Sequence, residues 1–265
     1  MINSNSRDKI PPETLLKLYV DFGIDETIGY ESKDYLSISD KIDEDTEGIN
    51  NFIRNNPLKE GKGVATDTPR DYQTLEELRD SLRNIKDFAL KSTSKNTVFS
   101  DGNPASDLMI IGEAPGGEED LCGLPFVGAS GNLLNEMLSS LGFTRENNVY
   151  ITNVIPWRPP GNRNPTPEEV TFCLPYLIQH IRIIRPKLLL LLGGLAGSSL
   201  LGKVESIAKY RGKWNELELN DAGKVLKIPC LATFHPSYLL RSPHQRRLAW
   251  RDFLAIREKL RSLVV

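Results

Sequence analysis

The sequence predicts an α/β protein with three layers, α/β/α, built on a central, mainly parallel four-stranded sheet. The prediction depends first on four short apolar runs: LMIIGE (108–113), VYITNVI (149–155), PKLLLLLG (186–193) and LKIPCLATFHP (226–236). It depends also on the segments between these runs, which have the apolar spacing of helices. Strands that alternate with helices form a parallel sheet with both faces covered, because each helix returns the chain to the same end of the sheet.

Helices are predicted before, between and after these strands. The apolar spacing from Thr74 to Leu90 indicates a helix, and Glu77 completes a capping box with Thr74. Helical spacing returns in GNLLNEMLSSLG, PTPEEVTFCLPYLIQHIRIIR and GGLAGSSLLG, which follow the first three strands. A last helix is expected from Pro243 through RRLAWRDFLAIREKLRSL.

Residues 73–265 are expected to form the folded domain, and residues 1–72 an N-terminal extension. Residues 12–22 have the spacing of a short amphipathic helix. From residue 25 to residue 72 the chain is polar and acidic, with DKIDEDTEG and the glycine-rich KEGKGV. Such a segment buries too little apolar area to offset its ordering entropy, so we expect a flexible linker.

The charges and cysteines limit the classes of function. Lys and Arg (33) nearly balance Asp and Glu (35), but residues 235–265 hold seven basic residues against two acidic ones. This stretch indicates a face for an anionic partner or, more simply, an amphipathic helix with a solvated side. Cys122, Cys173 and Cys230 form no C-x-x-C pair and suggest neither zinc nor disulfides. No run approaches the ~18 apolar residues of a membrane span, so a soluble, cytoplasmic protein is expected.

The first predicted strand ends in GEAPG, at the edge of the sheet where ligands bind in this fold class. Gly112 and Gly116 permit a tight turn, and the backbone amides around Ala114 can point into a cleft. Glu113 stands at the strand tip. The segment is not a phosphate loop, because no G-K-[ST] follows and a cluster of acids would repel phosphate. The alternative is a plain turn with solvated acids. The acids are Glu113, Glu118, Glu119 and Asp120.

Two further residues offer groups suited to a planar ring. Phe126 lies in the Gly/Pro-rich loop GLPFVGASG, where an aromatic ring can stack on a planar ligand. Asn153 ends YITNV, and its carboxamide offers a donor and an acceptor to the edge of a base. Each has a simpler alternative, in which Phe126 is a core residue and Asn153 a turn former.

The fourth strand ends in HPSYLLRSPHQRR, which combines polar, apolar and basic groups. His235 ends the strand, and Ser237 is a candidate phosphate contact. Leu239 and Leu240, followed by Arg241, have the pattern of an apolar wedge that enters a base stack while a cation holds the backbone. The alternatives are a buried structural histidine and the start of a core helix.

Together these segments resemble family 4 of the uracil-DNA glycosylases. The first shared motif is GEAPG, then E-D, then G-x-P-F-V-G-x-[AS]-G-x-L-L. The next is YITNV with RPPGNRNPTPEE, and the last is HPSYLLR with R-R-x-x-W-x-D-F. They occur in the family's order over residues 97–256. The resemblance implies the uracil-DNA glycosylase fold and a role in base excision repair, in which uracil is flipped from DNA and its N-glycosidic bond is hydrolysed.

The resemblance also implies roles for the candidate residues. Glu113 orients or activates the attacking water, and His235 bonds uracil O2, where negative charge develops. Phe126 stacks on the uracil ring, and Asn153 reads its N3/O4 edge. The implied substrate-binding set is Gly112, Ala114, Phe126 and Asn153, and the implied DNA-binding set is Ser237, Leu239, Leu240 and Arg241.

The expected partner is uracil-containing DNA, and the enzyme is expected to act as a monomer, at the nucleoid if it is bacterial. No lysine sits beside the motifs, so hydrolysis without lyase activity is expected. Two alternatives remain: a glycosylase for another deaminated or mismatched base, or a catalytically inactive DNA-binding repair protein. Residues 1–72 lie outside the resemblance and either dock a repair or replication partner or form an expendable tail.

Family 4 members typically hold an iron–sulfur cluster on four cysteines, and this sequence departs from that pattern. When the family's cysteine positions are aligned backward from FSDGNP, the first two ligand positions fall on Ile85 and Phe88. The third, in IPWRPP, falls on Trp157. Only Cys173 remains. One thiolate cannot hold a cubane cluster, so no cluster, metal or other cofactor is expected. The apolar residues suggest that a packed patch stabilises this region instead.

Overall fold

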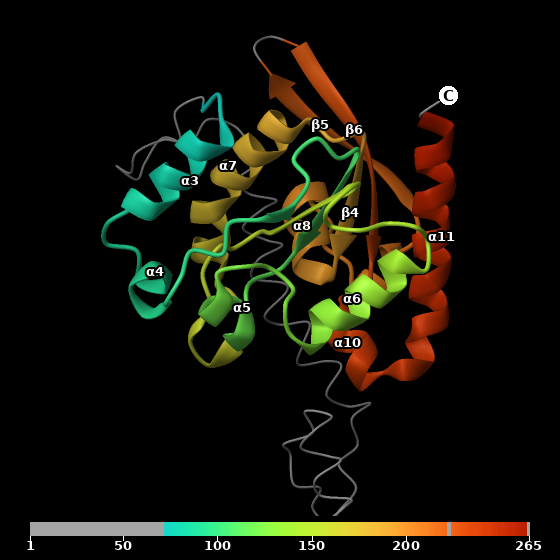
Figure 1. Cartoon of the computed structure of the whole chain (residues 1–265), viewed down its shortest axis with the longest axis horizontal. Coiled ribbons are helices and arrows are strands. Elements are labelled where there is room, and N and C mark those ends of the chain that lie inside the picture. The colour runs from blue at the N-terminus through green and yellow to red at the C-terminus, as the bar shows by residue number, and fades with distance from the viewer. Residues whose placement is uncertain (1–71, 222–223, 264–265) are drawn as a thin grey trace, which may run out of the picture. The chain divides into compact units, whose positions relative to one another are not determined.

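The computed structural model describes residues 72–221 and 224–263 (Figure 1). The short helix and the acidic linker that the sequence predicts before Tyr72 lie outside the described residues, so both stay predictions. Within the described ranges, no helix is both long enough and apolar enough to cross a membrane.

A six-stranded sheet forms the centre of the described fold, in the order β1-β3-β2-β4-β6-β5. Its four inner strands run parallel to one another. They are β3 (Val149–Asn153), β2 (Leu108–Gly112), β4 (Leu188–Leu192) and β6 (Lys224–Thr233). These are the four strands that the sequence predicts, so the parallel centre of the sheet is confirmed.

The two antiparallel edge strands were not predicted. β1 (Asp101–Gly102) pairs with β3, and β5 (Trp214–Asp221) pairs with β6. β1 has only two residues and no apolar run. In β5 charged residues alternate with the buried Leu217 and Leu219. This period of two is typical of a strand with one solvated face, and it is the sequence signal that could have found β5.

Helices cover both faces of the sheet, which confirms the three layers (Figure 1). The helices on one face are α3 (Leu75–Asn84), α7 (Pro167–Ile184) and α8 (Gly194–Leu201). Those on the other are α6 (Ala129–Ser139), α10 (Pro236–Arg241) and α11 (Arg246–Leu263).

The all-leucine strand β4 shows how one strand serves both cores. Leu189 and Leu191 pack on the side of α7, and Leu188, Leu190 and Leu192 pack on the side of α11. Successive side chains of a strand point to opposite faces, so a strand covered on both sides reads as a continuous apolar run.

The first predicted helix is in fact two helices. The N-cap Thr74 accepts a hydrogen bond from the backbone N–H of Glu77 at 3.2 Å, so the predicted start is confirmed. The helical spacing does not continue to Leu90, because α3 ends at Asn84 and Ile85 has a non-helical ψ of 130°. The chain starts again as α4 (Ala89–Thr93) after Asp87, whose φ is +60°. Aspartate is among the few residues that enter the left-handed region readily, and the spacing of apolar residues gives no information on this backbone conformation.

Candidate active site

Asn153 and Phe126 meet at Gly112, at the carboxyl end of β2. Gly112 is the last residue of β2 and pairs in register with Asn153, the last residue of β3. A Cβ atom on Gly112 would lie 2.5 Å from Phe126 Cζ and would also clash with Asn153 Oδ1. Only glycine leaves room for both side chains, so both lie directly against the Gly112 backbone.

His235 reaches the same place from a different strand. β6 ends at Thr233, and His235 follows as the N-cap of α10. The ring centroids of His235 and Phe126 lie 5.5 Å apart. A Cβ atom on Gly193, just after β4, would lie 3.1 Å from the His235 Cβ, so a glycine in this turn makes space for the histidine. Side chains that are distant in the sequence therefore gather at one end of the sheet.

Glu113 follows Gly112 directly and completes the predicted group. Its carbonyl oxygen accepts a hydrogen bond from the Ile155 N–H at 3.0 Å, which holds its backbone beside the segment after β3. Burial raises the pKa of its carboxyl group above the ordinary value of 4.5. Within residues 72–221 and 224–263, no side chain binds this carboxylate. A poorly solvated, unpaired carboxylate of this kind can hold and orient a water molecule.

The Asn153 side chain has an unused acceptor. The residue is 5% exposed, and its Oδ1 atom is buried with no hydrogen-bond partner in the described part of the chain. An orphaned buried acceptor costs about 1–3 kcal/mol. The atom therefore indicates a ligand that brings a donor, and the N3–H of uracil is a donor of this kind.

A hydrogen bond from Ser237 determines which ring nitrogen of His235 carries the proton. The Nδ1 atom accepts a hydrogen bond from the backbone N–H of Ser237 at 3.2 Å and lies 2.8 Å from the Ser237 Oγ. Because Nδ1 accepts, the neutral ring carries its proton on Nε2. Burial, and then the charge of Arg241, lowers the pKa of His235 to about 4. At neutral pH His235 is thus an uncharged ring with an Nε2–H donor.

The segment predicted to enter DNA differs from the prediction. It is the short helix α10 instead of a loop, and Leu239 is 0% exposed and packs in the core beside α6. The physical reason is that Pro236 at the first position starts a helix, which turns Leu239 inward. Leu240 is 38% exposed and Arg241 is exposed, so these two residues remain at the surface.

The sequence segment that carries these residues matches one protein family. The model of the Uracil DNA glycosylase superfamily matches residues 99–255. The chain belongs to this superfamily. It is similar to the type-4 uracil-DNA glycosylase of Archaeoglobus fulgidus, with 41% identity over 69% of this chain and 94% of the relative. It is also similar to the type-4 enzyme of Thermotoga maritima, with 45% identity over 64% of this chain and 83% of the relative, and to that of Pyrobaculum aerophilum, with 40% over 65% and 87%.

Two of the acids after the GEAPG turn, Asp120 and Glu119, have structural partners in this uracil-DNA glycosylase superfamily member. Asp120 is 4% exposed, and its Oδ1 accepts the backbone N–H groups of Lys95 and Asn96 at 2.9 and 3.1 Å. Glu119 binds backbone amides of the loop that contains Phe126. Arg145, which the sequence analysis did not identify, binds carbonyl oxygens of the same loop. No local pattern marks these residues, because their partners are backbone atoms from distant segments.

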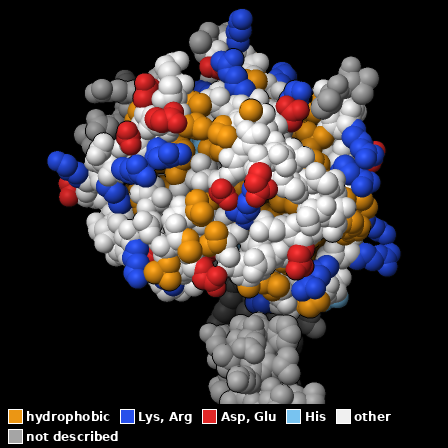
Figure 2. Space-filling model, in the orientation of Figure 1, with side chains coloured by type: hydrophobic (Ala, Val, Ile, Leu, Met, Phe, Trp, Pro, Cys, Tyr) orange, Lys and Arg blue, Asp and Glu red, His pale blue; other side chains and the backbone are white. Residues whose placement is uncertain are grey.

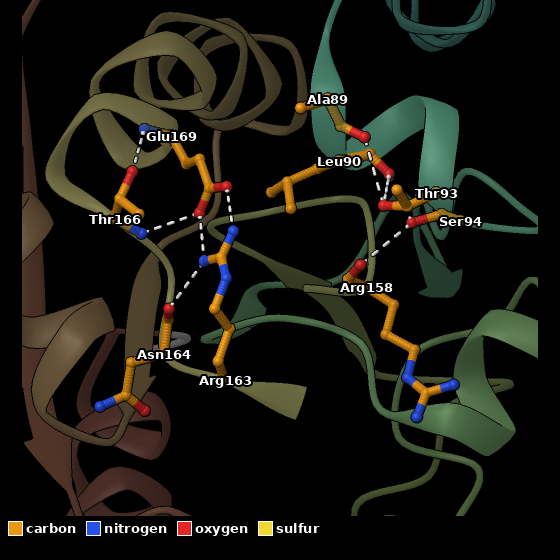
Figure 3. Close-up of polar contacts among 9 residues, drawn as sticks. All are labelled: Ala89, Leu90, Thr93, Ser94, Arg158, Arg163, Asn164, Thr166 and Glu169. Atoms are coloured by element: carbon orange, nitrogen blue, oxygen red, sulfur yellow. Dashed lines mark hydrogen bonds and ion pairs between the residues drawn. The ribbon is translucent and has the colours of Figure 1, made fainter. Parts of the chain in front are cut away.

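The loop after β3 is held by an ion pair and a helix cap (Figure 3). Arg163 donates two hydrogen bonds to the Glu169 carboxylate, at 2.9 and 2.6 Å. The same carboxylate accepts the N–H of Thr166, the N-cap of α7, at 2.8 Å. Ser94 Oγ, just after α4, donates to the carbonyl oxygen of Arg158 at 3.2 Å. The bonds to Glu169 hold the loop between β3 and α7 against the start of α7, and the Ser94 bond attaches it to the region of α4.

Basic residues gather along the exposed side of α11, at the right of Figure 2. The opposite side of this helix packs in the core through Ala249, Phe253, Ile256 and Leu260. The basic C-terminal stretch is therefore an amphipathic helix with one solvated side, which matches the simpler interpretation of its charge.

The positions of three cluster ligands in family 4 form an apolar patch here. Phe88 lies between two aromatic rings, with centroid distances of 5.3 Å to Trp157 and 4.1 Å to Phe172. Trp157 is 0% exposed, and its indole N–H donates to Thr97 Oγ1 at 3.0 Å. Ile85 packs against the same core. These side chains offer no ligand to iron.

The fourth position, Cys173, is a buried thiol in the same core. Burial raises its pKa well above the ordinary range, so it is protonated at neutral pH. Within the described residues, no group of three or more His, Cys, Asp or Glu side chains could hold a metal ion. The residues at the four positions do not fit an iron–sulfur cluster.

Proposed function

We propose that this protein is a monofunctional uracil-DNA glycosylase that flips uracil from DNA, hydrolyses its N-glycosidic bond and leaves an abasic site. The observation that carries the proposal is that Asn153 and Phe126 meet at Gly112, directly before Glu113 in the chain, with the His235 ring 5.5 Å from the Phe126 ring. The type-4 uracil-DNA glycosylases to which the chain is similar support it.

Recognition of uracil depends on a ring and an amide. Phe126 provides an aromatic face on which the base stacks. The free Oδ1 of Asn153 accepts the N3–H of uracil, and its amide nitrogen donates to O4. Cytosine has no proton on N3 and carries an amino group at position 4, so with the Asn153 amide in this orientation it would leave both groups unpaired. Unpaired buried groups are a strong basis for rejecting a substrate.

Cleavage requires that charge be stabilised on both sides of the C1′–N1 bond. The electron pair of this bond leaves with uracil, and the Nε2–H of His235 donates to O2, where negative charge develops. The sugar becomes cationic at C1′, where the Glu113 carboxylate stabilises it and orients the water that adds there. The water loses one proton and the uracil anion gains one, so the products are neutral uracil and an abasic sugar.

Extrusion of the base costs a few kcal/mol, which contacts to the DNA must offset. The exposed Leu240 is suited to fill the gap in the stack, and Arg241 is suited to bind a phosphate. The hydroxyl of Ser237 lies against His235 Nδ1, so we assign this serine to the histidine and not to a phosphate.

We further propose that the protein acts as a monomer in the cytoplasm, on uracil-containing DNA, with residues 1–72 available to a repair or replication partner. We propose that it works without an iron–sulfur cluster. The supporting observations are the aromatic packing of Phe88 and Trp157 and the protonated, buried thiol of Cys173. In this proposal the packed patch stabilises the region that the cluster stabilises in family 4.

A set of duplex oligonucleotides that differ at one base tests the proposed function. The base is uracil, hypoxanthine, mismatched thymine or, as a control, cytosine. After incubation, alkali cleaves each abasic site and mass spectrometry identifies the released base. We expect cleavage and free uracil from the uracil duplex alone, and much less of both with Glu113→Gln over the same incubation. Release of hypoxanthine or thymine would assign another lesion, and binding without cleavage would indicate an inactive repair protein.

A further inference from the structure

Phe126, the ring that we expect to stack on uracil, has an unusual backbone conformation. Its φ is +55°, in the left-handed region that residues with bulky side chains rarely adopt. Such a conformation persists only where the surrounding groups over-determine it. Two charged side chains bind the backbone on either side of Phe126 along the chain, and they supply this restraint.

Arg145 binds the carbonyl groups at Phe126 and just before it. Its guanidinium donates to the carbonyl oxygens of Pro125 at 2.7 Å and Phe126 at 2.5 Å. The same group also donates to Asp101 Oδ2 at 2.7 Å and to Asn135 Oδ1 at 2.9 Å. The side chain is 14% exposed. A planar cation with four acceptors around it has little freedom to move, so Arg145 acts as a rigid fork.

Glu119 binds the amide groups just after Phe126. Its Oε1 atom accepts the N–H groups of Val127 at 3.0 Å and Gly128 at 2.9 Å. Its Oε2 atom accepts the N–H of Gly116 at 3.1 Å, in the turn that follows β2. One carboxylate therefore connects the loop of the stacking ring to the turn of the predicted water-positioning carboxylate. Both oxygens are needed for this, because a neutral amide of the same size offers one acceptor only.

Two glycines allow the loop to pack closely on its surroundings. A Cβ atom on Gly131, in the first turn of α6, would clash with the carbonyl oxygen of Phe126. A Cβ atom on Gly112 would lie 2.5 Å from the ring. The Phe126 backbone is thus bounded by α6, and its ring by the end of β2, while Arg145 and Glu119 bind the polar groups between them.

We propose that Arg145 and Glu119 are positioning residues that clamp Phe126 in its left-handed conformation and hold its ring ready to stack on an extruded base. The inference rests on the proposed function, in which Phe126 is the stacking ring. Neither charged residue touches the substrate. A ring that is held in place before the base arrives needs no reordering when the base enters, and this preorganisation speeds the reaction.

Two conservative substitutions test the clamp. Arg145→Lys keeps the charge but loses the planar fork, and Glu119→Gln keeps the size but loses one acceptor oxygen. Single-turnover uracil release is measured with enzyme in saturating excess, together with the Kd for uracil-free duplex. We expect release to be about 10- to 100-fold slower in each variant, with the Kd for uracil-free DNA changed by less than about twofold.

A double-mutant cycle with Phe126→Ala separates positioning from a general structural effect. Without the ring the clamp has nothing to position, so Arg145→Lys and Glu119→Gln should then slow release by less than about threefold. An equal slowing in both backgrounds would overturn the proposal. Full activity of both clamp variants in the parent background would overturn it as well.

Arg185→Lys is the matched control. Arg185 also binds a carboxylate, Asp221, at 2.6 Å, but none of its bonds reaches the Phe126 loop. We expect this variant to release uracil at the parental rate. If the parent protein releases no uracil, the proposed function fails; if the parent is active and the clamp variants match it, only the clamp fails.

Discussion

The Nδ1 atom of His235 accepts the backbone N–H of Ser237, at 3.2 Å, in the first turn of the helix that His235 itself caps. The bond leaves the ring proton on Nε2, and the lowered pKa of His235, about 4, keeps the ring uncharged at neutral pH. A neutral donor is suited to uracil O2, because it is already in place before charge develops there.

Substitutions at this pair should differ in their effects. His235→Ala removes the donor, and we expect single-turnover uracil release to fall about 10²- to 10³-fold. Ser237→Ala removes the hydroxyl but keeps the backbone N–H that orients the ring, so a fall of only about threefold is expected. If both variants were equally slow, the hydroxyl of Ser237 and not its backbone would set the tautomer.

Glu113 should determine how the reaction responds to acid. The carboxylate is the active form, and burial raises its pKa above 4.5, whereas His235 stays neutral down to about pH 4. Release should therefore be constant near neutral pH and decline as the pH falls to the pKa of Glu113. Glu113→Gln should be slower by about 10²- to 10⁴-fold and lose this decline.

The control for this assignment is His235→Asn, measured over the same pH range. The variant should be slower than the parent, but its rate should decline at the same pH, because Glu113 is unchanged. A decline that moves or disappears in His235→Asn would assign the titration to the histidine.

Most of the fold could be predicted from the sequence. The inner strands are covered on both faces and therefore appear as apolar runs, such as the five leucines of β4. The rule that ligands bind at the carboxyl ends of strands then indicates that Asn153 and His235 lie near GEAPG. The edge strand β5 was missed because one of its faces is solvated, so it has no continuous apolar run and only its alternation of polar and apolar residues marks it.

Parts of the site could not be predicted, because they depend on contacts between distant segments. Arg145 and Glu119 bind backbone atoms of the Phe126 loop, and a backbone partner leaves no residue pattern to recognise. Leu239 and Leu240 are adjacent and chemically alike, so only the direction of α10 decides which one is buried.

The two leucines of α10 should therefore have separate roles. Leu240→Ala removes an exposed side chain. We expect this substitution to slow uracil release from duplex DNA more than from single-stranded DNA and to leave the thermal stability unchanged. Leu239→Ala removes a fully buried side chain and should lower the free energy of unfolding by about 2–5 kcal/mol. Denaturant unfolding and release assays on both variants check this. If Leu239→Ala slowed release from duplex and Leu240→Ala lowered the free energy of unfolding, Leu239 would again be the residue expected to enter DNA.

The aromatic patch should stabilise the fold without iron. Purified protein is expected to contain no iron above background and to show no visible absorbance, and Cys173→Ala should change neither its stability nor its activity greatly. Trp157→Ala should lower the free energy of unfolding by about 3–5 kcal/mol, because the indole is fully buried. Stoichiometric iron that is lost in Cys173→Ala would contradict the proposal.

A structure of Glu113→Gln bound to a uracil-containing duplex would show where the target base lies. We expect an extruded uracil whose ring lies on Phe126, whose N3–O4 edge faces the Asn153 amide and whose O2 faces Nε2 of His235. A uracil that remains stacked in the duplex, or that lies outside the group around Gly112, would contradict this expectation.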